Sequence, residues 1–120
     1  MIDHRERFPK MLSTAYDVSP PPGWDALVEA LLKRIHDSLD SEAREAFRVS
    51  QIKEKYGELR VYHNGDDEVE AIVDEATETS RRTCQICGEP GKITNNKGWV
   101  AALCEEHAKK PYMVPTCELR

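Results

Sequence analysis

The chain has 120 residues, of which 39% are hydrophobic and 32% charged, and its net charge is −5. This length fits one domain, or one small domain with a metal-stabilised module, and an acidic chain argues against a general nucleic-acid binder. No apolar run is long enough for a membrane-spanning helix, and the polar start suggests no secretory signal, so the cytoplasm is the expected compartment. The charge is uneven, with −8 over residues 1–80 and +3 over residues 81–120.

The first part of the chain leads into a strongly patterned helix. Residues 1–23 are expected to be irregular, because the run Pro20-Pro21-Pro22-Gly23 is incompatible with a helix interior, although the apolar residues of FPKMLSTAY can pack on the body. From Trp24 to Leu39, apolar residues recur at the spacing of one buried helical face, which predicts the first main helix. A short helical segment follows and turns Phe47 into the core.

Residues 48–63 read as a β-hairpin that turns at Tyr56-Gly57, because β-forming residues alternate with polar ones. Lys53, Lys55 and Arg60 lie among its tyrosines, an arrangement that can hold a nucleic-acid backbone and stack bases. The favoured alternative is that edge lysines discourage aggregation while the tyrosines pack, since two glutamates of the hairpin offset the local charge.

Residues 66–82 are predicted to form the second main helix, with Asp66 or Asp67 at its N-cap and a narrow apolar stripe. Its exposed face is strongly acidic over residues 66–80, and Arg81 and Arg82 follow in the last turn. Such a charge run is ordinarily a solvated face. The alternative is a surface that mimics phosphate or docks a basic partner.

The strongest motif consists of four potential metal ligands in two closely spaced pairs, Cys84-x2-Cys87 and Cys104-x2-His107. Three thiolates and one imidazole suit tetrahedral zinc, and four protein ligands close the coordination sphere, which indicates one structural Zn²⁺ rather than a catalytic one. Two disulfides or a redox pair are the disfavoured alternatives. Cys117 is not needed for the set. It is expected to be a free thiol, and its distance from the ordered pairs disfavours a role as a substitute ligand.

Between the two pairs, the runs KIT and WVAAL predict a second hairpin, and a helical turn ended by Pro111 places Cys104 and His107 on one face. The chain thus has a turn at Cys84-x2-Cys87, called the knuckle, then a hairpin, and then a helix that carries the last two ligands. This order resembles a treble-clef zinc finger. The acidic helix runs directly into the first cysteine, so helix and metal site are expected to pack as one unit, with Trp99 and Val100 as packing partners.

The sequence therefore predicts an α+β fold with two main helices and a β-hairpin, closed by a C-terminal treble-clef-like zinc module. The expected divisions are a lead-in at 1–23, a helix, hairpin and helix body at 24–82, a zinc module at 83–111 and a tail at 112–120.

Three stretches carry a wider resemblance: GWDALVEALLKRI, QIKEKYGELRVY, and SRRTCQICGEPGK together with GWVAALCEEHA. They lie between residues 23 and 108 and resemble a family of small hypothetical proteins of bacteria and bacteriophages. The resemblance implies an intracellular, zinc-binding protein linked to mobile elements, and it implies no activity.

These observations favour a zinc-stabilised, non-enzymatic binding protein whose partner is another protein, such as a host defence or transcription component. The alternative is nucleic-acid binding by the basic zinc end and the hairpin, through Lys53, Lys55, Arg60, Arg81, Arg82, Lys92 and Lys97. A nuclease resembling the His-Asn-His group is a third hypothesis. It is disfavoured because the zinc hairpin holds no histidine and His63 is the one spare base.

Overall fold

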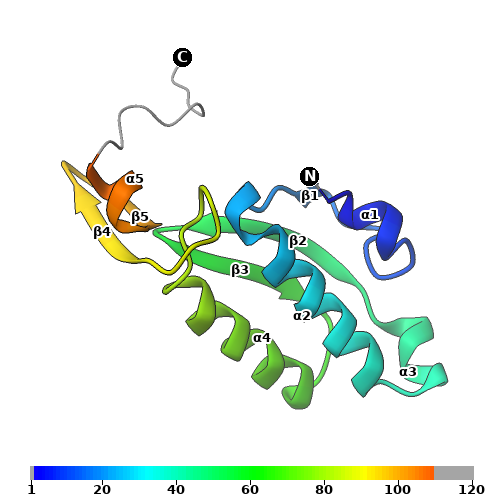
Figure 1. Cartoon of the computed structure of the whole chain (residues 1–120). Helices are drawn as coiled ribbons and strands as arrows, with labels where there is room; N and C mark the ends of the chain where they lie inside the picture. Colours follow the sequence, from blue (N-terminus) through cyan, green and yellow to red (C-terminus); the bar gives the residue numbers. More distant parts are fainter. Residues whose placement is uncertain (1, 110–120) are drawn as a thin grey trace.

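The computed structural model describes residues 2–109, which form a mixed α+β fold (Figure 1). Over this range the chain holds five α-helices and two small sheets. The helices are α1 (His4–Arg7), α2 (Asp25–Ser38), α3 (Ser41–Ala46), α4 (Asp67–Ser80) and α5 (Glu105–Lys109), with a short 3-10 helix, η1 (Pro22–Trp24), before α2. The strands are β1 (Asp17–Val18), β2 (Val49–Lys55), β3 (Glu58–His63), β4 (Lys92–Asn96) and β5 (Trp99–Leu103). None of these helices has the length and apolar character needed to span a bilayer.

The larger sheet has the strand order β1-β2-β3. Strand β1 runs parallel to β2, and β2 pairs with β3 in the antiparallel hairpin that the sequence predicts. The turn residues Tyr56 and Gly57 have φ angles of 55° and 81°, which suit the right-handed twist of a tight hairpin. This turn fixes the pairing of Lys55 with Glu58, and from Gln51 to Lys55 and along β3 the alternation then sends one set of side chains to each face. The register shifts between Val49 and Gln51, which interrupts the alternation at the start of β2.

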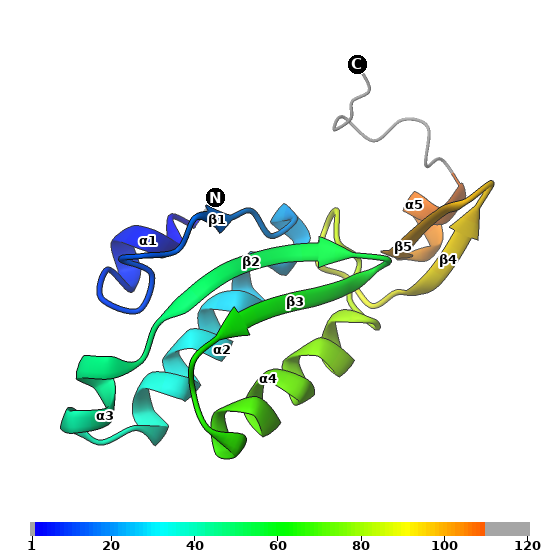
Figure 2. The same ribbon diagram turned by 180° about the vertical axis from the view of Figure 1, so that it is seen from behind.

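Helices α2 and α4 pack side by side and cover one face of this sheet, and the core lies between the two layers (Figure 1). Trp24, Leu32 and Ile35 from the α2 side and Leu59 from β3 are fully buried there. The two main helices predicted from apolar spacing are thereby confirmed. Figure 2 shows the opposite face of β2 and β3, over which no helix of residues 2–109 lies.

The expectation of an irregular lead-in is wrong in part. The side chain of Asp3 accepts a hydrogen bond from the Glu6 amide and begins α1, and Val18 of β1 pairs with Ile52 of β2. Leu12 is buried in the core, as the apolar character of this segment leads one to expect. A four-residue helix and a two-residue strand are too short to leave a periodic signal, because their stability comes from the body on which they pack.

The second hairpin, β4-β5, and α5 lie together at one end of the body (Figure 1). The hairpin and the ligand-bearing helix are confirmed over the described residues. The division of the chain into lead-in, body, module and tail stays a prediction. The predicted helix stop at Pro111, the tail at 112–120 and Cys117 lie outside the described residues.

A buried hydroxyl joins the outer edge of β3 to α4. Ser80 is fully buried and its Oγ accepts a hydrogen bond from the Leu59 amide at 2.9 Å. The same Oγ donates to the carbonyl oxygen of Thr77 at 2.6 Å, and Thr77 Oγ1 donates to the Leu59 carbonyl at 3.1 Å. Helix α4 therefore satisfies an edge-strand amide and carbonyl that would otherwise lie buried without partners.

We expect Ser80→Ala to lower the free energy of unfolding by about 1–3 kcal/mol, because it leaves the Leu59 amide buried without an acceptor. The matched control is Ser50→Ala, since Ser50 also donates to a backbone carbonyl but is exposed. Urea unfolding of both variants checks this prediction. Equal losses of stability in the two variants would contradict it.

Candidate metal centre

Three segments of the chain bring the predicted ligands together. Cys84 and Cys87 lie in the loop that follows α4, Cys104 directly follows β5, and His107 lies one helical turn further on in α5. The loop is a tight knuckle, in which the Cys84 amide donates to the Glu89 carbonyl at 2.7 Å and the Gly88 amide donates to the Cys84 carbonyl at 2.9 Å. Gly88 has φ 83°, a backbone conformation that favours glycine and lets the chain reverse at this point.

The spacing of the four donor atoms fits a single tetrahedral ion. All four lie within 4.8 Å of one another. The Cys87 and Cys104 sulfurs are 3.8 Å apart, and His107 Nδ1 is 3.5 Å from Cys84 Sγ and 3.2 Å from Cys104 Sγ. Ligands at zinc-like bond lengths in a tetrahedron have sulfur–sulfur distances of about 3.8 Å and sulfur–nitrogen distances of about 3.6 Å. Cys84, Cys87 and Cys104 are free thiols, whereas a disulfide brings two sulfurs to about 2.05 Å.

The charges of the thiols also favour a cation. Burial alone would raise the pKa of the Cys84 thiol, but the backbone amides of Cys104, Cys87 and Ile86 stabilise its thiolate and lower the pKa to about 6. The amide of Glu89 favours the Cys87 thiolate, but burial and the neighbouring cysteine side chains outweigh it and raise the pKa to about 11. The Cys84 thiolate therefore disfavours ionisation of Cys87, and a cation at the cluster would stabilise both thiolates.

Binding of zinc near pH 7 is expected to release about one proton or more per ion, because the ion must displace the proton of Cys87. The affinity is expected to fall as the pH falls, since protons compete with the ion for the same sulfurs. Calorimetric titration of the metal-free chain in two buffers of different ionisation enthalpy measures the protons released. Binding without proton release in both buffers would contradict the role of Cys87 as a ligand.

The knuckle is attached to the body by close backbone contacts. The Gly23 amide donates to the Gln85 carbonyl at 2.9 Å, and Trp24 Nε1 donates to the Thr83 carbonyl at 2.9 Å. Gln85 pairs with Ala102 of β5 twice, once through its amide at 2.8 Å and once through its side-chain oxygen at 3.0 Å. The buried indole of Trp24 thereby connects the metal cluster to the main core.

The expectation that Trp99 and Val100 are packing partners of the helix and the metal site is wrong for Trp99, which is 37% exposed, whereas Val100 is half-buried. Helix and module are joined instead through η1 and through the first hairpin. At the tip of that hairpin, Gly57 lies against Ile93 and the backbone of Ala101. The sequence does not reveal these contacts, although a glycine between a proline run and Trp24 is a signal for close approach.

The basic residues proposed as contacts fall into separate groups. Lys53 and Arg60 lie directly opposite each other on β2 and β3, with Lys55 two pairs further towards the turn. Arg81 reaches the same surface, where it forms an ion pair with Glu58. The remaining three do not join this group: Arg82 pairs with Glu78, and Lys92 and Lys97 lie on the second hairpin.

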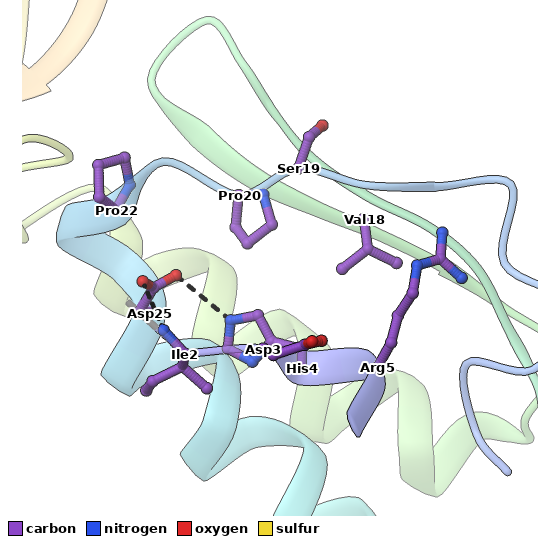
Figure 3. A pocket seen from close by; sticks show the side chains of 9 residues that line it. All are labelled: Ile2, Asp3, His4, Arg5, Val18, Ser19, Pro20, Pro22 and Asp25. Atoms are coloured by element: carbon purple, nitrogen blue, oxygen red, sulfur yellow. Dashed lines mark hydrogen bonds and ion pairs between the residues drawn. The ribbon is translucent and has the colours of Figure 1, made fainter. Parts of the chain in front are cut away.

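A pocket that the sequence does not reveal lies beside the start of α2 (Figure 3). Its volume is about 460 Å³, and segments 2–5 and 18–25 line it. His4 Nε2 lies 3.3 Å from Asp25 Oδ1, and the Ile2 amide donates to Asp25 Oδ2 at 3.5 Å. These bonds tie the N-terminal segment to α2.

No protein-family model matches the chain, and neither a curated protein nor a solved structure matches it. The family resemblance and the bacteriophage link suggested by the sequence therefore stay predictions. What the fold and the site define together is a small α+β protein with a Cys3His cluster that can hold one metal ion. Among residues 2–109 it is the one such group of histidine, cysteine and acidic donors.

Proposed function

We propose that the cluster binds one zinc ion in a structural role, as the centre of a treble-clef-like module. One observation carries this proposal: all four donors come from the protein and lie at tetrahedral spacing. A set of three thiolates and one imidazole suits zinc, and a closed set of protein ligands leaves no position for a reactive water. Cys84, Cys87, Cys104 and His107 would hold the ion, which supplies a cross-link between the knuckle and α5.

The second part of the proposal is that the zinc-stabilised chain is a non-enzymatic binding protein with a protein partner. The exposed side of α4 supports this, because it presents carboxylates along several turns. Two of them form ion pairs with cations of the chain, Glu75 with Arg34 and Glu78 with Arg82, and Glu70 lies 2.7 Å from His63 Nε2.

Asp67 and Asp74 lie two turns apart on α4, and among the described residues neither forms an ion pair. A partner with a basic surface would complement them. The resemblance to bacterial and bacteriophage proteins supports a host defence or transcription component as that partner.

Nucleic-acid binding is the second candidate, favoured by the cations on the open face of the larger sheet. A nuclease is not favoured. The spare histidine, His63, is almost fully buried, accepts a hydrogen bond from the Gly65 amide at Nδ1 and faces Glu70 through Nε2 at 2.7 Å. Both ring nitrogens are thus used to hold the connection between β3 and α4, which is a structural role.

Affinity purification from bacterial cells tests the protein partner. The tagged wild-type chain is expected to recover a specific protein, and Asp67→Asn combined with Asp74→Asn is expected to reduce that recovery about fivefold or more. Glu42→Gln, an exposed carboxylate on α3, is the matched control and should recover the same protein. Recovery of no specific protein by the zinc-loaded chain would count against the proposal.

A further inference from the structure

We infer that the open face of the β1-β2-β3 sheet binds single-stranded nucleic acid. This inference rests on the second candidate function, and it goes beyond the proposed protein binding because it concerns the face opposite the acidic helix α4. Two rows of side chains on this face, one aromatic and one cationic, carry it.

The aromatic row crosses the strands at Gln51. The hydroxyl of Tyr16, just before β1, donates to Gln51 Oε1 at 3.0 Å, and Tyr62 of β3 is the cross-strand partner of Gln51. The side-chain amide of Gln51 also donates to Asp17 Oδ2 at 2.9 Å, which holds this polar row in place. Tyr16 and Tyr62 are 73% and 43% exposed, so both rings are open to a stacking partner.

The cationic row lies one repeat further along the strands, at a distance of about 6.6 Å. In this row Lys53 faces Arg60 directly across β2 and β3. Like charges at opposed positions repel, and among the described residues no ion pair joins Lys53 to a carboxylate. Arg60 lies 3.1 Å from Glu58 through Nη2, but Glu58 is shared with Arg81. An anion over this row would relieve the repulsion.

The open face of the sheet carries a positive net charge, although the whole chain is acidic. Lys53, Lys55, Arg60 and Arg81 outnumber its two carboxylates, Asp17 and Glu58, whereas the whole chain has a net charge of −5. Most of the acidic surplus lies on α4, behind the sheet (Figure 2). A polyanion is therefore attracted to the open face and repelled from the helical layer.

Single strands fit this surface better than duplexes do. Exposed rings on a sheet can stack unpaired bases while neighbouring cations neutralise the phosphates, and this combination is sequence-tolerant. Bases within a duplex are already stacked and are not available to Tyr16 and Tyr62. The ligand is thus an unpaired strand of RNA or DNA, bound by stacking and by phosphate contacts together.

The test is fluorescence anisotropy with labelled oligo-dT and oligo-U, using the zinc-loaded full chain. Wild type is expected to bind both at roughly 50 mM salt, with a log–log salt slope near −1.4 for two neutralised phosphates. Lys53→Gln or Arg60→Gln is expected to reduce the magnitude of the slope by about 0.7. Tyr62→Leu is expected to weaken binding about fivefold or more, whereas Tyr62→Phe, which keeps the ring, should bind like wild type.

Controls separate this inference from its alternatives. Lys33→Gln, an exposed cation on α2, should leave binding unchanged, and thermal unfolding and metal content are measured for every variant. No binding by zinc-loaded wild type at low salt would overturn the inference and leave the zinc proposal standing. Binding of polyglutamate with equal affinity, insensitive to Tyr62→Leu, would overturn it in favour of an acidic protein segment.

Discussion

Replacing Cys84 with serine is expected to abolish tight metal binding and to lower the unfolding temperature by about 15 °C or more. Structural zinc sites have apparent binding free energies of about 10–16 kcal/mol, which is as large as the whole stability of a small domain. Cys84 is fully buried, and the carbonyl of the preceding Thr83 accepts the hydrogen bond from Trp24. Losing the ion therefore loosens the knuckle and the attachment of the core to it.

Thermal unfolding followed by circular dichroism, with and without added zinc, measures this effect. Wild type should become less stable in a chelator, and Cys84→Ser should respond neither to chelator nor to zinc. Cys117→Ser is the control, since Cys117 is not one of the four donors. A Cys84→Ser variant with the stability of the zinc-loaded wild type would show that the cluster does not hold the fold together.

Gly23→Ala is expected to destabilise the protein by about 3 kcal/mol, because the added Cβ clashes with the knuckle. A Cβ atom at this position would lie 2.3 Å from the Cys84 carbonyl oxygen and 2.5 Å from the Gln85 carbonyl carbon. Both are backbone atoms of the knuckle and cannot rotate away. The alanine must push the knuckle off η1 and break the hydrogen bond between Gly23 and Gln85.

Gly98→Ala is the matched control for this prediction. Gly98 has φ 94°, so alanine there is strained, but no atom lies within 4 Å of the added Cβ. The expected loss is about 1–2 kcal/mol, from the backbone conformation alone. Urea unfolding and zinc affinity are compared for the two variants, and only Gly23→Ala should also weaken zinc binding. Unchanged zinc affinity in Gly23→Ala would contradict the coupling between η1 and the metal cluster.

The elements that the sequence predicts are those whose signal is local. The apolar spacing from Trp24 to Leu39 predicts α2, and the motif Cys-x2-Cys with Cys-x2-His predicts the cluster, because spacing along the chain translates directly into a shared face or a shared turn. The hairpin turn at Tyr56-Gly57 is likewise a local matter of backbone conformation.

What the sequence does not reveal depends on long-range packing. Gly23 and Cys84 are 61 positions apart, and only the folded chain shows that the glycine makes room for the knuckle. Strand β1 forms only through its pairing with β2. The buried Ser80 is structurally important because its hydroxyl accepts a hydrogen bond from Leu59 at the edge of β3. For the same reason the basic residues form one set in the sequence but separate groups in space, since register and fold decide which cations share a face.

The most direct test of the central claim is the metal content of the purified protein, measured by elemental analysis beside Cys84→Ser and Cys104→Ser. The proposal predicts about one zinc per wild-type chain and none in either variant. Zinc in wild type at this ratio, lost together with the fold in both variants, would establish a structural site. A folded wild-type chain without metal, or variants that keep both metal and fold, would contradict it.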